Sequence, residues 1–186
     1  MPDTHIAAKS SGLLYALGDL KPQIDPTAWI APTAVLIGDV RVGPGANIWF
    51  NCVLRADTNP IIVGARTNIQ DGTVIHVDHG DHPAIIGDDV TVGHAAIIHA
   101  CRIENRAFIG MGATVLDGAV VEEAGLLAAR GFLGPGKRIG KQELWMGSPA
   151  KLARVMSNEE RAGWDETVPH YLGLAAHFRD TLKPIG

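Results

Sequence analysis

Aromatic residues and cysteines are scarce in this sequence. Of its 186 residues, 5% are aromatic and two are cysteines, Cys52 and Cys101. So few aromatic side chains fit poorly with the cores of ordinary β-sandwiches and helical bundles. The two cysteines form no CxxC motif, so we expect two reduced thiols, buried or half-buried, which is typical of cytoplasmic proteins.

Long apolar runs and a large excess of one charge are also absent. No stretch approaches the roughly 18 to 20 apolar residues that a membrane-spanning helix needs. The first ten residues, MPDTHIAAKS, lack the basic head and apolar run of a secretory signal. The net charge is −4, and Lys and Arg are scattered along the chain, whereas nucleic acids and anionic membranes attract broad basic surfaces. We therefore expect a cytoplasmic protein that binds neither.

A large aliphatic residue recurs with a period of six residues. The period is interrupted by two insertions and by one five-residue step between Ile98 and Ile103. Four positions after each large residue stands a small one in most repeats. The large residues are Ile24, Ile30, Leu36, Val42, Ile48, Leu54, Val63, Ile69, Ile75, Ile86, Val92, Ile98, Ile103, Ile109, Val115, Val121, Leu127, Leu133 and Ile139. The small residues are Ala28, Ala34, Ala46, Thr67, Thr73, Ala96, Ala107, Ala113, Ala119 and Gly125. Neither an amphipathic helix nor an alternating strand has this period.

This hexapeptide pattern predicts a left-handed parallel β-helix over residues 24–145. Three hexapeptides form one coil of about 18 residues, and coils stack about 4.8 Å apart. The large and the small residue both point into a narrow triangular prism. Turn-forming residues such as Asp89, Asn105 and Gly118, and the run Gly43-Pro44-Gly45, stand where corners are expected. The hexapeptide proteins are an exception to the right-handed rule for crossovers between parallel strands.

The flanks of the repeat region differ from it, within what we expect to be one domain of residues 1–186. Residues 11–20, SGLLYALGDL, predict an N-terminal strand that covers the first coil. Residues 157–182 predict a C-terminal helical segment packed along the prism. Ser157 and Glu160 form a capping box for a first helix, and Pro169 suits the first turn of a second one.

Five of the eight histidines lie between positions 76 and 99, and three of them fall at outward positions of adjacent coils. His76 and His99 each follow an inward isoleucine by one residue, and His94 follows Val92 by two. A single outward histidine is usually an ordinary surface residue. Three on neighbouring coils suit a metal bound at ~2.0–2.1 Å, with the open fourth position of a catalytic zinc. Zn²⁺ is the expected metal, and Fe²⁺ or Co²⁺ accept similar ligands.

Two long segments and the motif GSPAK carry a family resemblance over nearly the whole chain. The segments are LRADTNPIIVGARTNIQDGTVIHVDHG and IGDDVTVGHAAIIHACRIENRAFIGMGATVLDGAVVEE. The chain resembles the γ-class carbonic anhydrases and their bacterial hexapeptide-repeat homologues. The resemblance implies reversible hydration of CO2 to bicarbonate by a metal-bound hydroxide. It also implies a homotrimer with its metal sites at the subunit interfaces, where one subunit supplies His76 and His99 and its neighbour supplies His94.

The same resemblance implies roles for five further residues. Gln70 matches the residue that hydrogen-bonds the metal-bound water. Arg55, Asp57 and Asp71 match an ion-pair cluster between subunits, where Arg55 can also attract bicarbonate. Tyr171 matches a tyrosine close to the metal in the bacterial homologues. A purely structural interface network and an ordinary helix-packing tyrosine are the alternatives for these two groups.

This sequence departs from the family pattern in two places. Thr58 stands where the best-characterised active enzymes carry a glutamate. The acidic loop that supplies their proton-shuttle glutamate is replaced by the short VDHGDHPA. His79 and His82 in that loop are candidate proton shuttles, because imidazole titrates in the range that a shuttle needs, but we favour a solvated loop without a catalytic role. These departures leave open a weak carbonic anhydrase activity.

Other functions are compatible with hexapeptide repeats. Acyltransferases of this architecture use acyl-CoA and a single histidine base, and the GSPAK motif occurs in them too, so it does not discriminate. The three-histidine set does, because a transferase has no need of it. A metal-dependent ester or thioester hydrolase would use the same site with another substrate. A non-enzymatic assembly role is disfavoured, because Gln70 and Arg55 accompany the three histidines.

Overall fold

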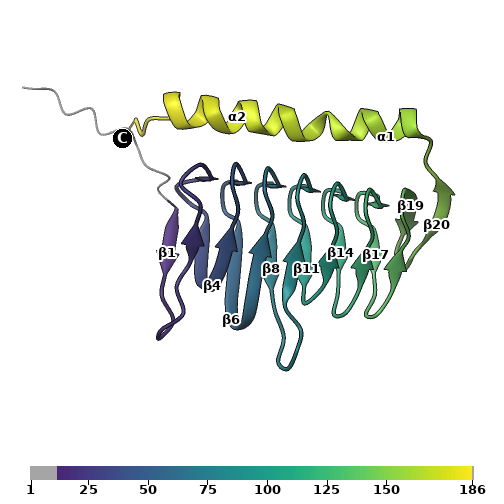
Figure 1. The fold of residues 1–186 in the computed structure, drawn as a ribbon, viewed down its shortest axis with the longest axis horizontal. Coiled ribbons are helices and arrows are strands. Elements are labelled where there is room, and N and C mark those ends of the chain that lie inside the picture. Colours follow the sequence, from purple (N-terminus) through teal and green to yellow (C-terminus); the bar gives the residue numbers. More distant parts are fainter. Residues whose placement is uncertain (1–11, 186) are drawn as a thin grey trace, which may run out of the picture.

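The computed structural model describes residues 12–185, which wind into a left-handed parallel β-helix of about seven turns (Figure 1). Each turn contributes one short strand to each of three flat faces, as the hexapeptide period predicts. On the first face lie β1 (Leu13–Tyr15), the first part of β4 (Val35–Val42), the first part of β6 (Val53–Val63), β8 (Val74–His76), β11 (Ile97–His99), β14 (Thr114–Val115) and β17 (Phe132–Leu133).

The other two faces follow the same stacking. On the second face lie β2 (Gln23–Ile24), the later parts of β4 and β6, β9 (Ala84–Ile86), β12 (Arg102–Ile103), β15 (Val120–Val121) and β18 (Arg138–Ile139). On the third face lie β3 (Trp29–Ile30), β5 (Asn47–Ile48), β7 (Asn68–Ile69), β10 (Thr91–Val92), β13 (Phe108–Ile109), β16 (Leu126–Leu127) and β19 (Glu143–Gly147). Because β4 and β6 continue around one corner, the first two faces share one sheet.

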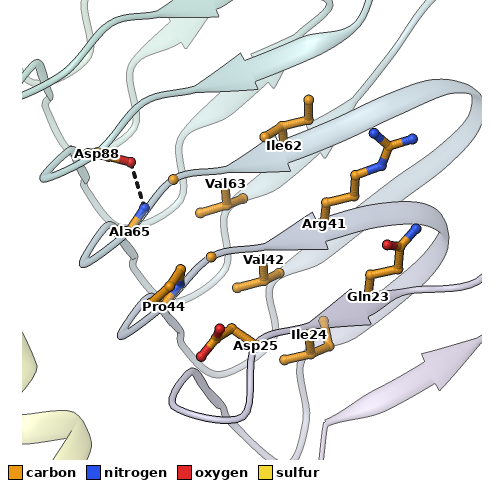
Figure 2. Close-up of a pocket in the computed structure, with 12 residues that line it drawn as sticks. Gln23, Ile24, Asp25, Arg41, Val42, Pro44, Ile62, Val63, Ala65 and Asp88 are labelled. Atoms are coloured by element: carbon orange, nitrogen blue, oxygen red, sulfur yellow. Dashed lines mark hydrogen bonds between the residues drawn. The ribbon is translucent and has the colours of Figure 1, made fainter.

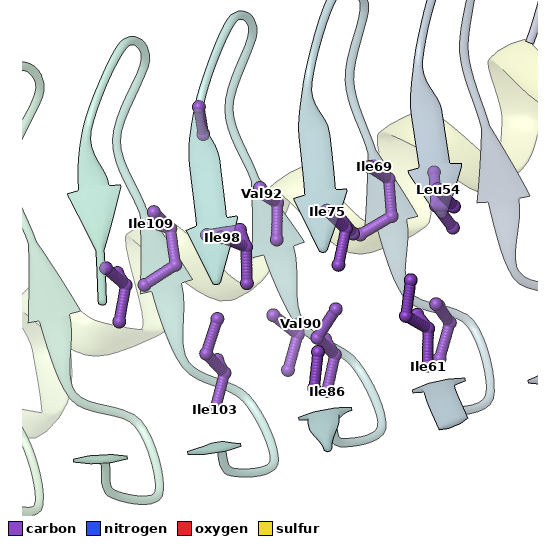
Figure 3. Close-up of a cluster of buried hydrophobic side chains, with 14 of the residues drawn as sticks. Leu54, Ile61, Ile69, Ile75, Ile86, Val90, Val92, Ile98, Ile103 and Ile109 are labelled. Atoms are coloured by element: carbon purple, nitrogen blue, oxygen red, sulfur yellow. The ribbon is translucent and has the colours of Figure 1, made fainter. Parts of the chain in front are cut away.

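The predicted aliphatic positions form the core of the prism. All of them except Ile24 belong to one buried cluster, and Ile24 packs against it partly buried. Figure 3 shows part of this cluster, with the side chains of successive turns in rows that run along the β-helix. The predicted small residues, such as Ala96 and Ala113, are fully buried between them. The six-residue period is therefore confirmed as the pattern of the core.

The corners use left-handed backbone conformations. Asp89 and Gly118 have φ of 56° and 64°, as expected of turn residues. At the corner predicted around Asn105, the left-handed residue is Arg106, with φ of 60°. The Asn105 side chain instead accepts a hydrogen bond of 2.9 Å from the backbone N–H of Asp88 in the preceding turn. Both cysteines are free and buried, as predicted, and burial raises the pKa of each thiol to about 12.

The N-terminal strand is shorter than predicted. It spans Leu13–Tyr15 and runs parallel to β4, and Leu17 and Leu20 then close a turn through two backbone hydrogen bonds. Ser11, where the predicted strand begins, and the segment MPDTHIAAKS lie outside the described residues.

The C-terminal part contains one strand that the repeat pattern does not predict. Strand β20 (Ala150–Val155) folds back antiparallel on β19, and the turn between them holds a cis peptide bond before Pro149. Helix α1 (Asn158–Asp165) begins at Ser157, whose hydroxyl accepts the N–H of Glu160 at 3.1 Å, so the predicted cap forms. Helix α2 (Thr167–Thr181) carries Pro169 in its first turn.

Helix α2 runs along the solenoid and contacts β3, β5 and β7 of the third face (Figure 1). Trp29 and Trp49 on that face pack edge-on against Phe178 of the helix, with ring centroids 5.9 and 5.2 Å apart, and Tyr171 packs on Trp49 at 5.3 Å. Half of the aromatic residues thus gather where the helix docks: Trp29, Trp49, Phe50, Tyr171 and Phe178. Within residues 12–185, neither helix has the length and apolarity needed to cross a membrane.

Candidate metal centre

His76 and His99 lie side by side on the first face. They end strands β8 and β11 and stand directly opposite each other in the parallel register. Each follows an inward isoleucine, so the period-two geometry of a strand turns both rings outward. Nδ1 of His76 lies 3.1 Å from Nε2 of His99, and both side chains are half-buried. The structure therefore brings together two of the three predicted metal ligands.

The remaining ring nitrogen of each histidine faces a carboxylate. Nε2 of His76 is 3.1 Å from Oδ1 of Asp57, which also pairs with Arg55. Nδ1 of His99 is 3.0 Å from Oδ1 of Asp117. Burial acts to raise the pKa of Asp57, but the hydrogen bond and charge of His76 and the charge of Arg55 outweigh it, so the pKa lies below the usual value.

These contacts determine which nitrogens can bind a metal. An ionised carboxylate only accepts hydrogen bonds, so Nε2 of His76 and Nδ1 of His99 carry the ring protons. In two neutral rings, the lone pairs of His76 Nδ1 and His99 Nε2 then point at each other across 3.1 Å. Two lone pairs at this distance repel unless a cation or a shared proton compensates. Two ligands of a tetrahedral metal at ~2.05 Å stand about 3.3 Å apart, so the pair fits a common metal.

His94 lies on a different edge of the prism, at the corner between the third and first faces. Its Nδ1 is 2.9 Å from Oδ2 of Asp71, and the other oxygen of Asp71 accepts the backbone N–H of Phe50 at 3.2 Å. Its Nε2 lies 3.4 Å from the hydroxyl of Tyr171 on α2. Burial, and then the charge of Asp71, raise the pKa of Tyr171, so this phenol stays protonated at neutral pH.

One chain does not bring the three histidines together. Within residues 12–185, no group of three or more His, Cys, Asp or Glu side chains is placed to hold a metal. The same separation distributes the charged residues: Asp57 and Arg55 lie with His76, and Asp71 lies with His94. A three-histidine site therefore requires His94 from a second copy, which is the arrangement that the sequence resemblance implies.

Gln70 is buried on the third face, one residue after the inward Ile69. Its Nε2 donates to Oδ1 of Asn68 at 3.0 Å, and Nδ2 of Asn68 donates to the hydroxyl of Thr91 at 2.9 Å. These two hydrogen bonds fix the orientation of the Gln70 side chain. Because its NH2 group already donates to Asn68, its carbonyl oxygen is the end that can accept a further hydrogen bond. Asn68 and Thr91 were not predicted, because each directly precedes an inward residue and the six-residue period therefore places it on the outer side of the prism, whereas in the structure both are buried.

The loop with His79 and His82 is anchored by the middle of β6, between its parts on the first and second faces. Nδ2 of Asn59 donates to the backbone carbonyls of Asp78 and Gly80 at 2.6 and 2.7 Å. The hydroxyl of Thr58 donates to the same carbonyl of Asp78 at 3.1 Å. Thr58, at the position of the family's glutamate, therefore holds this loop. Among the described residues, no hydrogen bond joins His79 or His82 to the histidine pair.

A shallow groove opens on the second face, away from all three histidines (Figure 2). Its charged side chains already have partners. Arg41 pairs with Asp39 at 2.8 Å, Asp25 accepts from Thr27, and Oδ1 of Asp88 accepts the N–H of Ala65 at 2.8 Å, the dashed line in Figure 2. No set of free polar groups converges there, so the histidines are the better candidate.

The histidine pair borders an apolar surface. Val74 and Ile97 stand two residues before His76 and His99 on the same outward side, and both are exposed. Met111, in a turn of the next coil, is exposed as well. Such a group of exposed apolar side chains is a feature of protein–protein contact surfaces.

Comparison with known proteins finds relatives in plants and bacteria. The chain is 45% and 46% identical to gamma carbonic anhydrases 1 and 2, mitochondrial, of Arabidopsis thaliana, over 90% and 84% of its own length. It spans 63% and 58% of the length of these two relatives. It is 43% identical to the carnitine operon protein CaiE of Escherichia coli, over 78% of this chain and 74% of that protein.

Solved structures give the same fold. A hexapeptide transferase family protein from Anaplasma phagocytophilum superposes with a TM-score of 0.85 at 43% identity, covering 89% of this chain and 98% of that one. A putative acetyltransferase from Bacillus cereus superposes with a TM-score of 0.88 at 38% identity, covering 91% and 98%. No family model matches the sequence.

Proposed function

Because this chain belongs to the γ-carbonic-anhydrase-like family of hexapeptide-repeat proteins, we propose that it is a metal-dependent carbonic anhydrase that interconverts CO2 and bicarbonate. The observation that carries the proposal is the pair of facing nitrogens of His76 and His99, 3.1 Å apart. Each of these rings is held by a carboxylate on its far side. An acyltransferase with one histidine base has no use for such a pair.

The proposed ligands are His76 and His99 of one copy and His94 of a second copy. Zn²⁺ is the expected metal, and Fe²⁺ or Co²⁺ take the same nitrogen ligands. When bound, the metal would act as a Lewis acid that lowers the pKa of a coordinated water to about 7. The chain's own part is to present three ring nitrogens: Nδ1 of His76 and Nε2 of His99, which face each other, and Nε2 of His94, beside the Tyr171 hydroxyl.

Other residues would orient and attract the reactants. The side-chain carbonyl oxygen of Gln70 takes no part in the hydrogen bond to Asn68. It can therefore accept a hydrogen bond from a water and fix the orientation of that water. The half-exposed guanidinium of Arg55 would attract the bicarbonate anion. The hydroxyl of Tyr171, which stays protonated, can donate a hydrogen bond beside His94.

A homotrimer is part of the proposal. The exposed Val74 and Ile97 beside the histidine pair, and the exposed Met111, which stands after Ile109 as His94 stands after Val92, would be covered by a second copy. A contact between two different surfaces closes into a ring when the rotation between copies is one third of a turn. Each of the three interfaces would then hold one site. A cytoplasmic location also belongs to the proposal, and the names of the two Arabidopsis relatives place those proteins in mitochondria.

Metal analysis combined with stopped-flow CO2 hydration tests the proposed activity. We expect about one metal per chain, loss of hydration after chelation, and recovery on adding Zn²⁺ or Co²⁺. Gln70→Ala should lower turnover and leave the metal content unchanged. Full activity in protein verified to be metal-free would contradict the proposal.

Acyl transfer is the second candidate, because the two structural neighbours are described as a transferase and a putative acetyltransferase. Hydrolysis of an ester or thioester by the same metal site is the third. The same preparations, given acetyl-CoA with an amine acceptor or a thioester alone, separate the three activities. Transfer that survives removal of the metal would favour the acyltransferase.

A further inference from the structure

Asp117 touches the candidate centre but belongs to the next coil. It follows strand β14, and its Oδ1 lies 3.0 Å from Nδ1 of His99. Its backbone is fixed on both sides by the stacked turns. The N–H of Gly118 donates to the carbonyl of Ala100 at 2.8 Å, and the carbonyl of Asp117 accepts the N–H of Gly136 at 2.8 Å. The carboxylate is therefore held against the imidazole by neighbouring coils.

This contact selects one tautomer of His99. The carboxylate accepts, so the ring proton sits on Nδ1 and the lone pair on Nε2. Nε2 is the atom that faces Nδ1 of His76. Without the carboxylate, the ring could place its proton on Nε2 and lose the nitrogen it presents to the centre.

An ordinary surface ion pair does not account for Asp117. Asp39, Asp89 and Asp165 each pair with an arginine. Within residues 12–185, no lysine or arginine pairs with Asp117, and the ring of His99 is the partner that its side chain contacts. Its placement is thus directed at the histidine.

We propose that Asp117 is a positioning residue for the metal centre: it accepts the Nδ1–H of His99 and thereby directs Nε2 at a divalent cation. The inference rests on the proposed function, because it assumes that the histidines bind a metal. A carboxylate behind a ligating histidine fixes the ring and raises the basicity of the ligating nitrogen, and its loss typically weakens metal affinity by about 10–100-fold.

Metal affinity of the full chain provides the test. Zn²⁺ dissociation constants are measured by competition with a chromophoric chelator, and Co²⁺ absorption reports the ligand geometry. We expect Asp117→Ala to raise the dissociation constant about 10–100-fold. Asp117→Asn keeps an acceptor oxygen and should fall between it and the wild type. The control, Asp39→Ala, removes a carboxylate paired with Arg41 and should bind metal as the wild type does.

The outcomes separate this inference from the proposed function. Unchanged Zn²⁺ affinity and Co²⁺ spectra in both Asp117 variants would overturn the inference and leave the metal site intact. If Asp117→Ala does not fold, as judged by circular dichroism of the metal-free protein, Asp117→Asn decides by the same comparison. Wild-type protein that binds neither metal would instead overturn the proposed function, and the inference with it.

Discussion

At the scale of single residues, neighbours in the chain have opposite environments. Ile97 is 48% exposed and Ile98 is fully buried, because successive side chains of a strand point to opposite sides. The same chemical change at the two positions should therefore act on different properties. Ile98 contributes to the core of the chain, and Ile97 to the surface beside the histidine pair.

We expect Ile98→Ala to lower the free energy of unfolding by about 2–5 kcal/mol, the usual effect of emptying a close-packed site. Ile97→Ala should leave the unfolding of the dilute chain almost unchanged and weaken association between copies. Urea unfolding and sedimentation equilibrium measure the two effects. Equal destabilisation by both variants, with no change in association, would contradict the assignment of Ile97 to an interface.

Asp25 gives a pH-dependent contribution to stability. Its Oδ1 accepts the hydroxyl and the N–H of Thr27 at 2.5 and 2.8 Å, and the Thr27 hydroxyl accepts the N–H of Gly45 in the next turn at 2.9 Å. The hydroxyl bond, and then the N–H bond, lower the pKa of Asp25 below 3.8. A carboxyl whose pKa is lower in the folded state than in the unfolded state stabilises the fold fully when the pH is above its unfolded-state pKa. This contribution is lost as the pH falls through its folded-state pKa.

Between about pH 5 and pH 2, the thermal midpoint of Asp25→Asn should therefore fall less steeply than that of the wild type. The control is Asp19→Asn, because Asp19 is exposed and makes no hydrogen bond within residues 12–185. Differential scanning calorimetry across this range measures the slopes. Parallel curves for the wild type and Asp25→Asn would show that Asp25 does not contribute in this way.

At the scale of elements, helix α1 is joined to the prism through a buried arginine. Arg161 is 3% exposed, and its Nη2 donates to Asp165 and to the carbonyl of Arg106. Its Nε and Nη1 are buried without a hydrogen-bond partner in the described part of the chain. Burial lowers the pKa of Arg161, against the opposing effect of Asp165. Asp165 also pairs with Arg106 at 2.7 Å, so it lies between two cations.

We expect Asp165→Asn to destabilise the protein by about 3 kcal/mol, which is the low end of the range for breaking a buried ion pair. The low end applies because the side chain of Asp165 is 32% exposed. Arg161→Met should be neutral or stabilising, since it removes the two buried nitrogens that have no partner in the described part of the chain, Nε and Nη1, and leaves Asp165 with Arg106. Urea midpoints measure both changes. A large loss of stability in Arg161→Met would show that the contacts of its guanidinium with Asp165 and the carbonyl of Arg106 outweigh its desolvation.

The elements differ in how well the sequence predicts them. The strands of the prism were predicted because their six-residue period is local and repeated. Helix α1 was predicted from the cap at Ser157, which depends on residues three apart. Strand β20 was not, because its pairing with β19 depends on one turn around Pro149 and has no repeat. The aromatic packing of Tyr171 on Trp49 joins residues more than a hundred positions apart, and no short-range pattern encodes it.

At the scale of the whole molecule, the site was predicted in part. The outward direction of His76 and His99 follows from the repeat, and in the structure the two rings face each other. Their role as metal ligands stays a prediction. The pairing of Asp117 with His99 was missed, because the side-chain alignment of successive coils depends on the lengths of insertions and corners. A metal site that combines His94 with His76 and His99 remains a prediction, because it depends on a second copy of the chain.

The most direct test of a site shared between copies mixes two variants that are each inactive, His94→Ala and His76→Ala. They are denatured, combined in equal amounts and refolded together. If His76 and His99 of one copy act with His94 of another, random assembly into a ring should restore about a quarter of the sites, because each interface has one chance in four of pairing the intact residues. Metal content and CO2 hydration should both recover to this extent. One variant is labelled with ¹⁵N so that mass distinguishes the copies. No recovery in trimers confirmed in this way to be mixed would contradict the shared site.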